Sequence, residues 1–331
     1  MFGSRSRREV VGLAAGLLMA TAACSSQGGA QSTAGGGGGG TAPDSPRLTF
    51  AMISHAPDGD AFFDVIKKGA QDAADKDNIE FKYSSSGEVP VQSTFIQNAI
   101  DSKVDGIAVS LPDPDALAPV IQKAVAAGIP VVAFNAGDRA WPKTGALAFY
   151  GEPEVLAGEF AGTKLNDLGS KHTLCVLQAQ GQVQLEDRCA GIASKFGGQT
   201  EKLYAQGTDT PQYVSTVSSK LRQDPSIDSV VTLGPSLGVA VQQQLEQDGN
   251  KAKVVTYAFN NDLIPLLQNG KVAFTIDQQP YLQGYLSIDS LWLYKKNKSV
   301  IGAQQSVPTG PVVIDQTNIG DILDGVKSGI R

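Results

Sequence analysis

The chain has 331 residues and a formal net charge of −6 at pH 7, from 27 basic and 33 acidic side chains. This acidic excess argues against a nucleic-acid-binding protein, which needs a basic face. Only two His and three Cys occur, so we expect no metal site, and nothing in the chain predicts a cofactor. The roughly 285 residues beyond position 46 exceed what one hydrophobic core usually organises, so two lobes are expected.

The first 23 residues are typical of a signal peptide. Arg5, Arg7 and Arg8 form a short basic segment, and an uncharged apolar run covers residues 10–23. This run is too short to span a bilayer comfortably and ends in small residues, which favours cleavage over an uncleaved anchor. The adjacent arginines also suggest twin-arginine export, and the sequence leaves open whether that route or general secretion is used.

The segment after the apolar run predicts a lipid anchor and a spacer. Thr21-Ala22-Ala23-Cys24 resembles the lipobox of bacterial lipoproteins, with Thr21 where Leu is usual. The resemblance implies that Cys24 is acylated and becomes the new N-terminus. Residues 24–46 contain Gly35–Gly40 and almost no charge, a composition that behaves as a flexible tether. We therefore expect an extracytoplasmic protein of the cell envelope, attached to the cytoplasmic membrane by its lipid only.

With Cys24 assigned to the anchor, Cys175 and Cys189 remain as an even pair in an exported protein. A disulfide is favoured over two buried thiols.

Short apolar runs alternate with helical patterns along the rest of the chain. Strands are predicted over residues 48–53, 79–83, 106–111, 130–134, 174–178, 229–233, 254–259 and 272–276. Helices are predicted through Phe62 to Ala73 and over residues 91–102 and 115–127. This β-α alternation is typical of a parallel sheet with helices on both faces.

The two halves of the chain echo each other. Residues 105–135 run from Asp-Gly-Ile-Ala-Val-Ser-Leu-Pro to Ala-Phe-Asn, and residues 228–260 run from Asp-Ser-Val-Val-Thr-Leu-Gly-Pro to Ala-Phe-Asn. The two segments have nearly the same length, which indicates duplicated lobes.

Polar side chains follow the predicted strands. Ligands of open parallel sheets bind at the carboxyl ends of the strands, so two facing lobes would share one site. The polar residues at these ends are Ser54, His55, Ser110, Asn135, Asn260, Asp277 and Gln278. Hydroxyls, amides and carboxylates match the donors and acceptors of vicinal hydroxyl groups. Phe62 and Phe63 could offer an aromatic face to a sugar ring, although such a pair opening a helix is often core.

Four stretches carry a family resemblance: residues 58–63 (Asp-Gly-Asp-Ala-Phe-Phe), 112–117 (Pro-Asp-Pro-Asp-Ala-Leu), 126–131 (Ala-Ala-Gly-Ile-Pro-Val) and 277–285 (Asp-Gln-Gln-Pro-Tyr-Leu-Gln-Gly-Tyr). With them, the chain resembles the periplasmic sugar-binding proteins of the ribose-binding type from residue 47 to about 311. The resemblance implies a type I periplasmic binding protein: two Rossmann-like α/β lobes, joined by a hinge of three crossovers, that close over a ligand. By this resemblance, residues 47–150 and 279–308 form the N-terminal lobe, and 151–278 and 309–331 the C-terminal lobe.

The resemblance also implies roles for single residues. It puts Asp60, Phe62 and Phe63 on the ligand wall of the first lobe. Arg188 matches a cleft Arg of the second lobe that donates to sugar hydroxyls, and Gln278 matches a cleft Gln.

Several family positions carry different side chains here. Ser110 falls where the family has an Asn. Asn135 falls where it has an Asp followed by Arg, and Ala136 follows here. Asn260 falls on another family Asp, and Gly234 stands where relatives have an Asn. These departures imply that the ligand need not be ribose. The positions of Cys175 and Cys189 recur as a pair in one branch of the family, which supports the disulfide.

The enzyme alternatives lack their motifs. No G-x-G-x-x-G follows the first strand and no G-x-S-x-G occurs. Asp58 and Asp60 share one loop and would not span a glycosidic bond. We therefore expect a monomeric lipoprotein, not an enzyme, that captures a small neutral polyhydroxylated ligand, a sugar or sugar alcohol, for an ABC permease and its ATPase. The alternative is a sensory binding protein that presents its ligand to a chemoreceptor or another signalling receptor.

Overall fold

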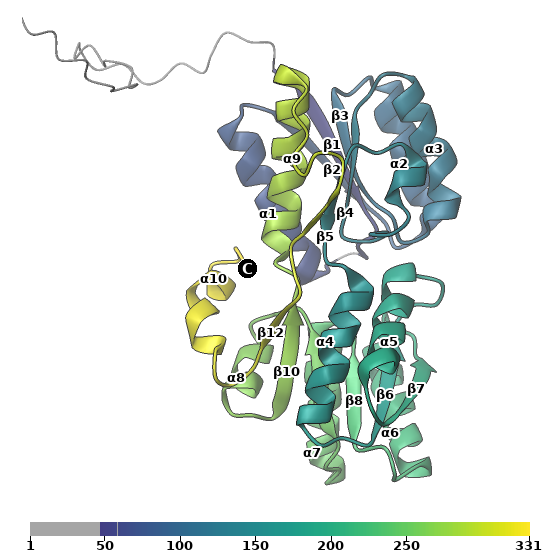
Figure 1. Cartoon of the computed structure of the whole chain (residues 1–331), viewed down its shortest axis with the longest axis vertical. Helices are drawn as coiled ribbons and strands as arrows, with labels where there is room; N and C mark the ends of the chain where they lie inside the picture. Colours follow the sequence, from purple (N-terminus) through teal and green to yellow (C-terminus); the bar gives the residue numbers. More distant parts are fainter. Residues whose placement is uncertain (1–46, 58) are drawn as a thin grey trace, which may run out of the picture. The chain divides into compact units, whose positions relative to one another are not determined.

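The computed structural model describes residues 47–57 and 59–331. The predicted signal peptide, the lipidation site Cys24 and the tether lie outside the described residues. Two six-stranded sheets, each with helices on both faces, make up the described part of the chain (Figure 1). Within residues 47–57 and 59–331, no helix combines the length and apolar character needed to cross a membrane.

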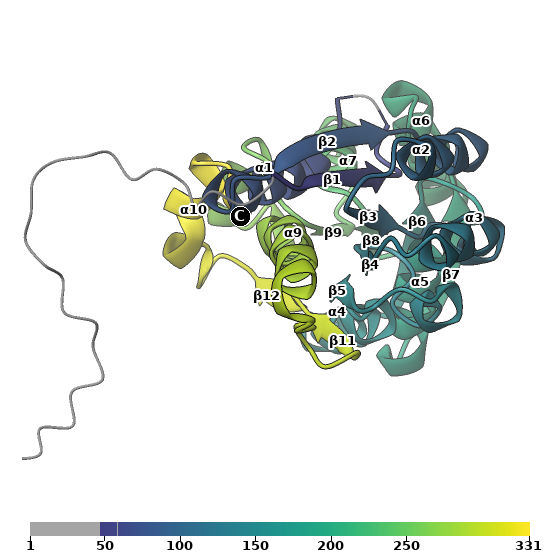
Figure 2. The ribbon, with the colours of Figure 1, turned by 90° about the horizontal axis from the view of Figure 1, so that it is seen from above.

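The N-terminal lobe contains a parallel sheet with the strand order β11-β5-β4-β3-β1-β2. Its strands are β1 (Thr49–Ser54), β2 (Glu80–Ser85), β3 (Gly106–Ser110), β4 (Val131–Phe134), β5 (Phe149–Gly151) and β11 (Ser306–Pro308). Helices α1 and α9 pack on one face, and α2 and α3 on the other (Figures 1 and 2). The helices are α1 (Ala61–Lys76), α2 (Val89–Asp101), α3 (Pro114–Ala126), the 3-10 turn η1 (Trp141–Thr144) and α9 (Pro280–Asn297).

The C-terminal lobe contains a sheet with the order β12-β10-β9-β8-β6-β7, in which only β12 is antiparallel to its neighbour. Its strands are β6 (His172–Leu177), β7 (Gln199–Tyr204), β8 (Ser229–Thr232), β9 (Lys253–Tyr257), β10 (Val272–Asp277) and β12 (Val312–Ile314). Helices α4 and α5 pack on one face, and α6, α7 and α8 on the other. The helices are α4 (Glu154–Asp167), α5 (Val183–Lys195), α6 (Thr210–Gln223), α7 (Pro235–Asp248), α8 (Leu263–Gln268), η2 (Ile319–Ile322) and α10 (Leu323–Lys327).

The strand order is the same in both lobes. Each begins at an outer strand, β2 or β7, and passes through β1-β3-β4-β5 or β6-β8-β9-β10 to a late-returning strand, β11 or β12. The echo between residues 105–135 and 228–260 therefore corresponds to β3-α3-β4 and β8-α7-β9, which occupy equivalent places. The prediction of two parallel-sheet α/β lobes is confirmed.

The pattern of burial explains why these segments form strands and helices. Every residue of β3 and of β6 is buried, as expected for strands of a parallel sheet covered on both faces. Asp60, Asp113 and Asp209 each cap a helix, because their side chains accept a hydrogen bond from a free backbone N–H of the first turn.

In each lobe, one pair of helices is packed so closely that only glycine fits at the contact. A Cβ on Gly284 of α9 would lie 1.8 Å from the carbonyl oxygen of Ile66 in α1, and a Cβ on Gly191 of α5 would lie 2.1 Å from that of Val155 in α4. Since α9 and α5 begin beside the ends of the strands, these close contacts hold both helices in fixed positions there.

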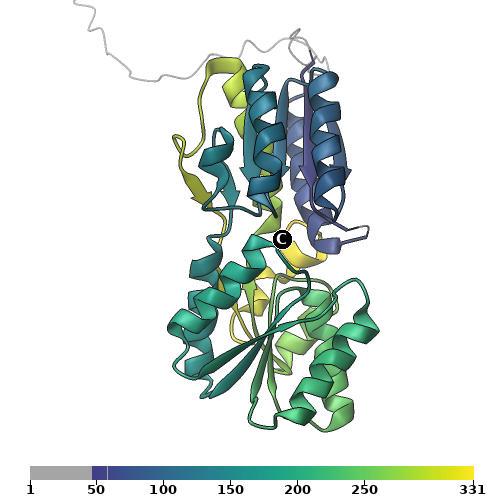
Figure 3. The same ribbon diagram turned by 90° about the vertical axis from the view of Figure 1, so that its right-hand side faces the viewer.

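The chain crosses between the lobes three times, between β5 and α4, between β10 and α9, and between β11 and β12 (Figure 3). These crossovers contain Glu152, Gln278 and Thr309, which are buried polar residues. At the second crossover, Asp277 accepts a hydrogen bond from Nε of Arg331, at 2.8 Å, so the end of the chain is tied to the hinge. The predicted hinge of three crossovers is therefore present.

Candidate ligand-binding site

The carboxyl ends of the strands of the two lobes face each other and are in contact. Nε2 of Gln184, in the first turn of α5, lies 3.2 Å from Nε2 of His55, which follows β1. The backbone N–H of Val183 donates to the carbonyl oxygen of Pro112 at 3.2 Å. Because these contacts join residues at the strand ends, the polar side chains nearby belong to one site between the lobes.

His55 and Ser110 form the N-terminal part of this site. The Ser110 hydroxyl lies 2.8 Å from Nδ1 of His55 and accepts from the His55 backbone N–H at 2.9 Å. Nδ1 and Nε2 of His55 face Ser110 and Gln184, so each ring nitrogen lies beside a polar side chain. Burial and the nearby charge of Arg188 lower the pKa of His55 to about 3, so the ring is neutral. Phe63 meets the ring edge-on, with centroids 4.9 Å apart.

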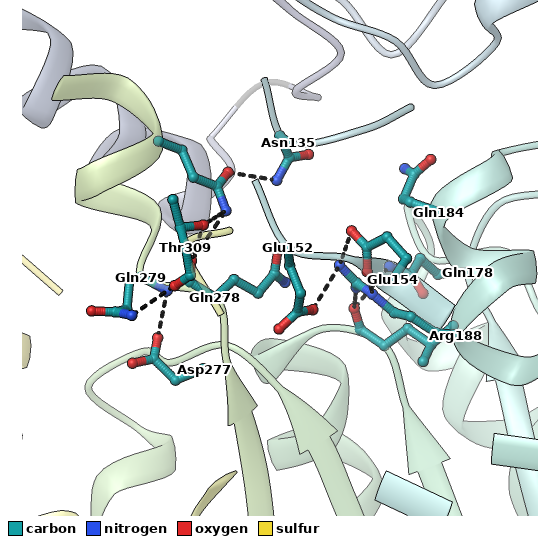
Figure 4. A network of polar contacts seen from close by, with 12 residues as sticks. Asn135, Glu152, Glu154, Gln178, Gln184, Arg188, Asp277, Gln278, Gln279 and Thr309 are labelled. Atoms are coloured by element: carbon teal, nitrogen blue, oxygen red, sulfur yellow. Dashed lines mark hydrogen bonds and ion pairs between the residues drawn. The ribbon is translucent and has the colours of Figure 1, made fainter. Parts of the chain in front are cut away.

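Asn135 and the second and third crossovers form a second group (Figure 4). Asn135, with φ of 62°, follows β4, and its Nδ2 donates to Oε1 of Gln283 at 3.0 Å. Nε2 of Gln283 in turn donates to the backbone oxygen of Gln278 and the hydroxyl of Thr309, both at 3.2 Å. The Thr309 hydroxyl donates to that same Gln278 oxygen at 2.7 Å. Gln283 thus ties one strand end to two crossovers.

Arg188 of α5 is the positive centre of the site. Its Nε and Nη2 donate to the two carboxylate oxygens of Glu154 at 2.5 Å and 3.0 Å, and a carboxylate oxygen of Glu152 lies 3.9 Å from Nη2 (Figure 4). The guanidinium also lies over the ring of Tyr257, 4.7 Å from its centroid. Burial is the main cause that raises the pKa of Glu154 to about 7, against the lowering effect of Arg188. The positive charge at this end of the site is therefore balanced by acidic partners.

Several buried oxygens of the site have no hydrogen-bond partner. These are Oε1 of Gln178, Gln184 and Gln278, and both carboxyl oxygens of Glu152. Buried polar atoms in folded proteins are nearly always hydrogen-bonded, so a group of exceptions in one place indicates where a ligand or water molecules bind. Hydroxyl groups would satisfy them, because a hydroxyl donates and accepts.

The structure brings together five of the residues predicted to bind the ligand, His55, Ser110, Asn135, Arg188 and Gln278, all of which are buried at strand ends or on α5.

The remaining predicted residues have local contacts. Asp60 caps α1 through the N–H of Phe62, and Asn260 accepts from the N–H of Leu263 at 2.9 Å. Phe62 is half-buried and packs edge-on against Phe63, with centroids 5.3 Å apart. Contact of any of these residues with ligand stays a prediction.

Sequence reasoning missed Glu152, Glu154, Gln178, Gln184 and Thr309. Gln178 directly follows β6, so the strand-end rule could have found it. Glu152 and Glu154 follow β5, which has only three residues and was not recognised as a strand. Gln184 and Thr309 reach the site through the lobe-to-lobe packing, which leaves no pattern in the sequence.

The predicted disulfide between Cys175 and Cys189 is present, with the two Cα atoms 5.9 Å apart. It joins the buried strand β6 to α5, one residue from Arg188. It therefore anchors the helix that carries the positive centre of the site.

One cluster among the described residues could offer ligand atoms to a cation, and it lies at the amino end of β6, away from the site. Glu201 faces Nε2 of His172 at 3.7 Å, whereas Asp224 faces Nδ1 at 3.9 Å, so the carboxylates lie at different edges of the ring. Lys220 pairs with Glu201 at 2.7 Å, and the Ser226 hydroxyl donates to Asp224 at 2.6 Å. These contacts account for both carboxylates without a metal ion.

Comparison with known protein families identifies the architecture. The model of the periplasmic binding protein domain matches residues 50–299. The chain belongs to this family. Its members bind solutes and are not enzymes, which confirms the expectation of a binding protein; the resemblance to sugar-binding proteins is also confirmed.

Three relatives illustrate the likeness of this binding protein. A carbohydrate transporter protein of Acidothermus cellulolyticus 11B, solved in complex with myo-inositol, is 49% identical, with a TM-score of 0.85 over 86% of this chain and 100% of that chain. A solute-binding protein of Burkholderia graminis, in complex with D-arabinose, is 25% identical, with a TM-score of 0.74 over 85% and 98%. The xylose/arabinose-binding protein of Sulfolobus acidocaldarius is 28% identical over 85% of this chain and 74% of its own.

Proposed function

We propose that this binding protein holds a neutral cyclic polyol, a sugar or a cyclitol such as myo-inositol, between its lobes and delivers it to an ABC importer. The observation that carries the proposal is the group of unpartnered buried oxygens around Arg188, contributed by the C-terminal lobe and the hinge. The bound myo-inositol of the 49% identical relative supports a ring with several hydroxyls.

The charges of the site favour an uncharged ligand. Arg188 is already paired with Glu154 through two hydrogen bonds, and His55 is neutral. An anionic ligand would have to compete with a buried carboxylate for the same guanidinium. A hydroxyl, in contrast, adds hydrogen bonds to the free amide oxygens without adding charge.

Closure follows from contacts on both sides. A ligand shifts the equilibrium between open and closed lobes only by the difference between its affinities for the two states. Asn135 follows β4 in the N-terminal lobe and Gln184 lies on α5 in the C-terminal lobe, so one ligand that bonds both stabilises the closed arrangement. Anchoring through Cys24 would keep the protein beside the permease, and it forms part of the proposal.

Thermal unfolding against a panel of pentoses, hexoses, linear polyols and cyclitols tests the proposal. A ligand at about 100 times its Kd stabilises the folded state by about 2.7 kcal/mol, which raises the Tm by about 5–10 °C. Gln278→Leu should abolish the shift, whereas Gln71→Leu, which changes an exposed glutamine of α1, should keep it. No shift with any compound would refute the proposal.

A further inference from the structure

Glu152 is an unusual residue of the site. It lies between β5 and α4 on the first crossover, and its side chain has no exposed surface. No N–H or hydroxyl group donates to either carboxyl oxygen, and the polar neighbour of the carboxyl group is the carboxyl of Glu154. An ionised carboxylate in such a place would lose its hydration without replacement, which is strongly unfavourable. A bound proton or a new hydrogen-bond partner must therefore compensate for the hydration that the Glu152 carboxyl loses.

The second and third crossovers lie close to the side chain of Glu152. A Cβ on Gly310 would lie 2.9 Å from Oε1 of Glu152 and 3.2 Å from the Cα of Gln278. The carboxyl group thus lies where the crossovers meet, 3.9 Å from Arg188. A ligand held by Arg188 and by Gln278 of the same hinge is therefore within reach of Glu152.

The surrounding charges do not stabilise Glu152 as a second ionised carboxylate beside Glu154. The charged and titratable groups near it come from both lobes and the hinge: Glu154, Arg188, Tyr257 and Asp277, with Asp138 and Arg331 one contact farther away. Arg188 is matched by Glu154, and Asp277 by Arg331. Burial, followed by repulsion from Glu154, raises the pKa of Glu152 well above its ordinary value, although Arg188 opposes the rise.

We propose that Glu152 is a specificity-determining residue that contacts the ligand as a neutral carboxylic acid. Its O–H donates to one ligand hydroxyl, and its carbonyl oxygen accepts from a neighbouring one. This inference rests on the proposed function and adds a selection rule: the preferred ligand has two adjacent hydroxyls at this position, and a deoxy analogue leaves a buried polar atom unpaired.

The proposal has a direct consequence for pH. The complex requires the protonated acid, so the pKa of Glu152 is higher in the complex than in the open protein. Affinity is therefore greatest at acidic pH and falls as pH rises from the lower to the higher of these pKa values, by at most about tenfold per pH unit for one proton.

Two substitutions separate the chemistry of the side chain from its shape. Glu152→Gln keeps one donor and one acceptor without a titrating proton, whereas Glu152→Leu keeps the approximate volume without hydrogen bonds. Glu246→Leu, at a side chain that is 43% exposed on α7, is the matched control. Binding of the first sugar or cyclitol that stabilises the wild type is measured by calorimetry between about pH 5 and about pH 9, a range chosen to cover the expected proton release.

E152L should lose about thirtyfold in affinity, the effect of two neutral hydrogen bonds. E152Q should stay within about threefold of wild type at the acidic end and lose less affinity as pH rises. Because Glu152 and Glu154 interact, the pKa of Glu154 also changes in E152Q, so the pH dependence is judged together with the affinity of E152L at the same pH values. E246L should match the wild type.

The proposal is overturned if E152L binds as tightly as wild type, or if E152Q has the wild-type pH dependence. If E152L does not fold, the comparison of E152Q with wild type decides alone. A wild type that binds none of the compounds would instead refute the proposed function, so the two failures are distinguishable.

Discussion

Replacing Arg188 by Met should destabilise the protein strongly, because it removes the only cation bonded to Glu154 among the described residues. Glu154 has no exposed surface and accepts two hydrogen bonds from the guanidinium. Breaking a buried pair by removing one partner typically costs about 3–5 kcal/mol. A domain of ordinary stability has only about 5–15 kcal/mol, so the variant should fold with a much reduced margin.

The loss should depend on pH and on Glu154. Arg188 holds the pKa of Glu154 down, so its removal raises that pKa further above about 7. In acid, Glu154 becomes neutral and the penalty for the unpaired charge disappears. The R188M defect should therefore be large near pH 8 and small near about pH 5. The double variant E154Q/R188M should lie within about 2 kcal/mol of wild type, since it leaves no unpaired charge.

Urea unfolding of the wild type, both single variants and the double variant, at both pH values, measures these differences. Our account of Arg188 as the charge partner of Glu154 is wrong if R188M matches wild type near pH 8. It is also wrong if E154Q/R188M is no more stable than R188M. Sugar affinity should be compared only after these stabilities are known, because R188M changes both.

Two further changes test the scaffold. C175A/C189A should lower the free energy of unfolding in urea by about 3 kcal/mol, because the disulfide closes a loop over a sequence separation of 14 and so restricts the unfolded chain. A loss below about 1 kcal/mol would contradict this. Gly284→Ala should lower the free energy of unfolding by at least about 1–3 kcal/mol, because its Cβ would lie 1.8 Å from a carbonyl oxygen of α1. Gly87→Ala is the control: no atom lies within 4 Å of its Cβ, so it should change the free energy of unfolding by less than about 0.5 kcal/mol. Equal stabilities of the two glycine variants would refute the close packing of α1 and α9.

The strands and the duplicated order of the lobes could be predicted from local patterns. Every residue of β3 and β6 is buried, so their apolar runs are continuous and easily recognised. Boundaries shifted by one or two residues, as at β1 and α2, because caps and last turns are decided by local hydrogen bonds. The strand β5 was missed because three residues are too few to show a pattern.

The sequence by itself determined the two parallel-sheet lobes, the disulfide pair and the strand-end residues His55, Ser110 and Asn135, because period, spacing and strand ends are local properties. Only the tertiary structure decided which side chains form ion pairs and which buried polar atoms have no hydrogen-bond partner. Glu152, Glu154 and Arg188 lie within 37 positions in the sequence, yet their pairing and pKa shifts arise from burial at the meeting of two lobes. That burial is a property of the packed fold, since it depends on atoms supplied by all three crossovers at once.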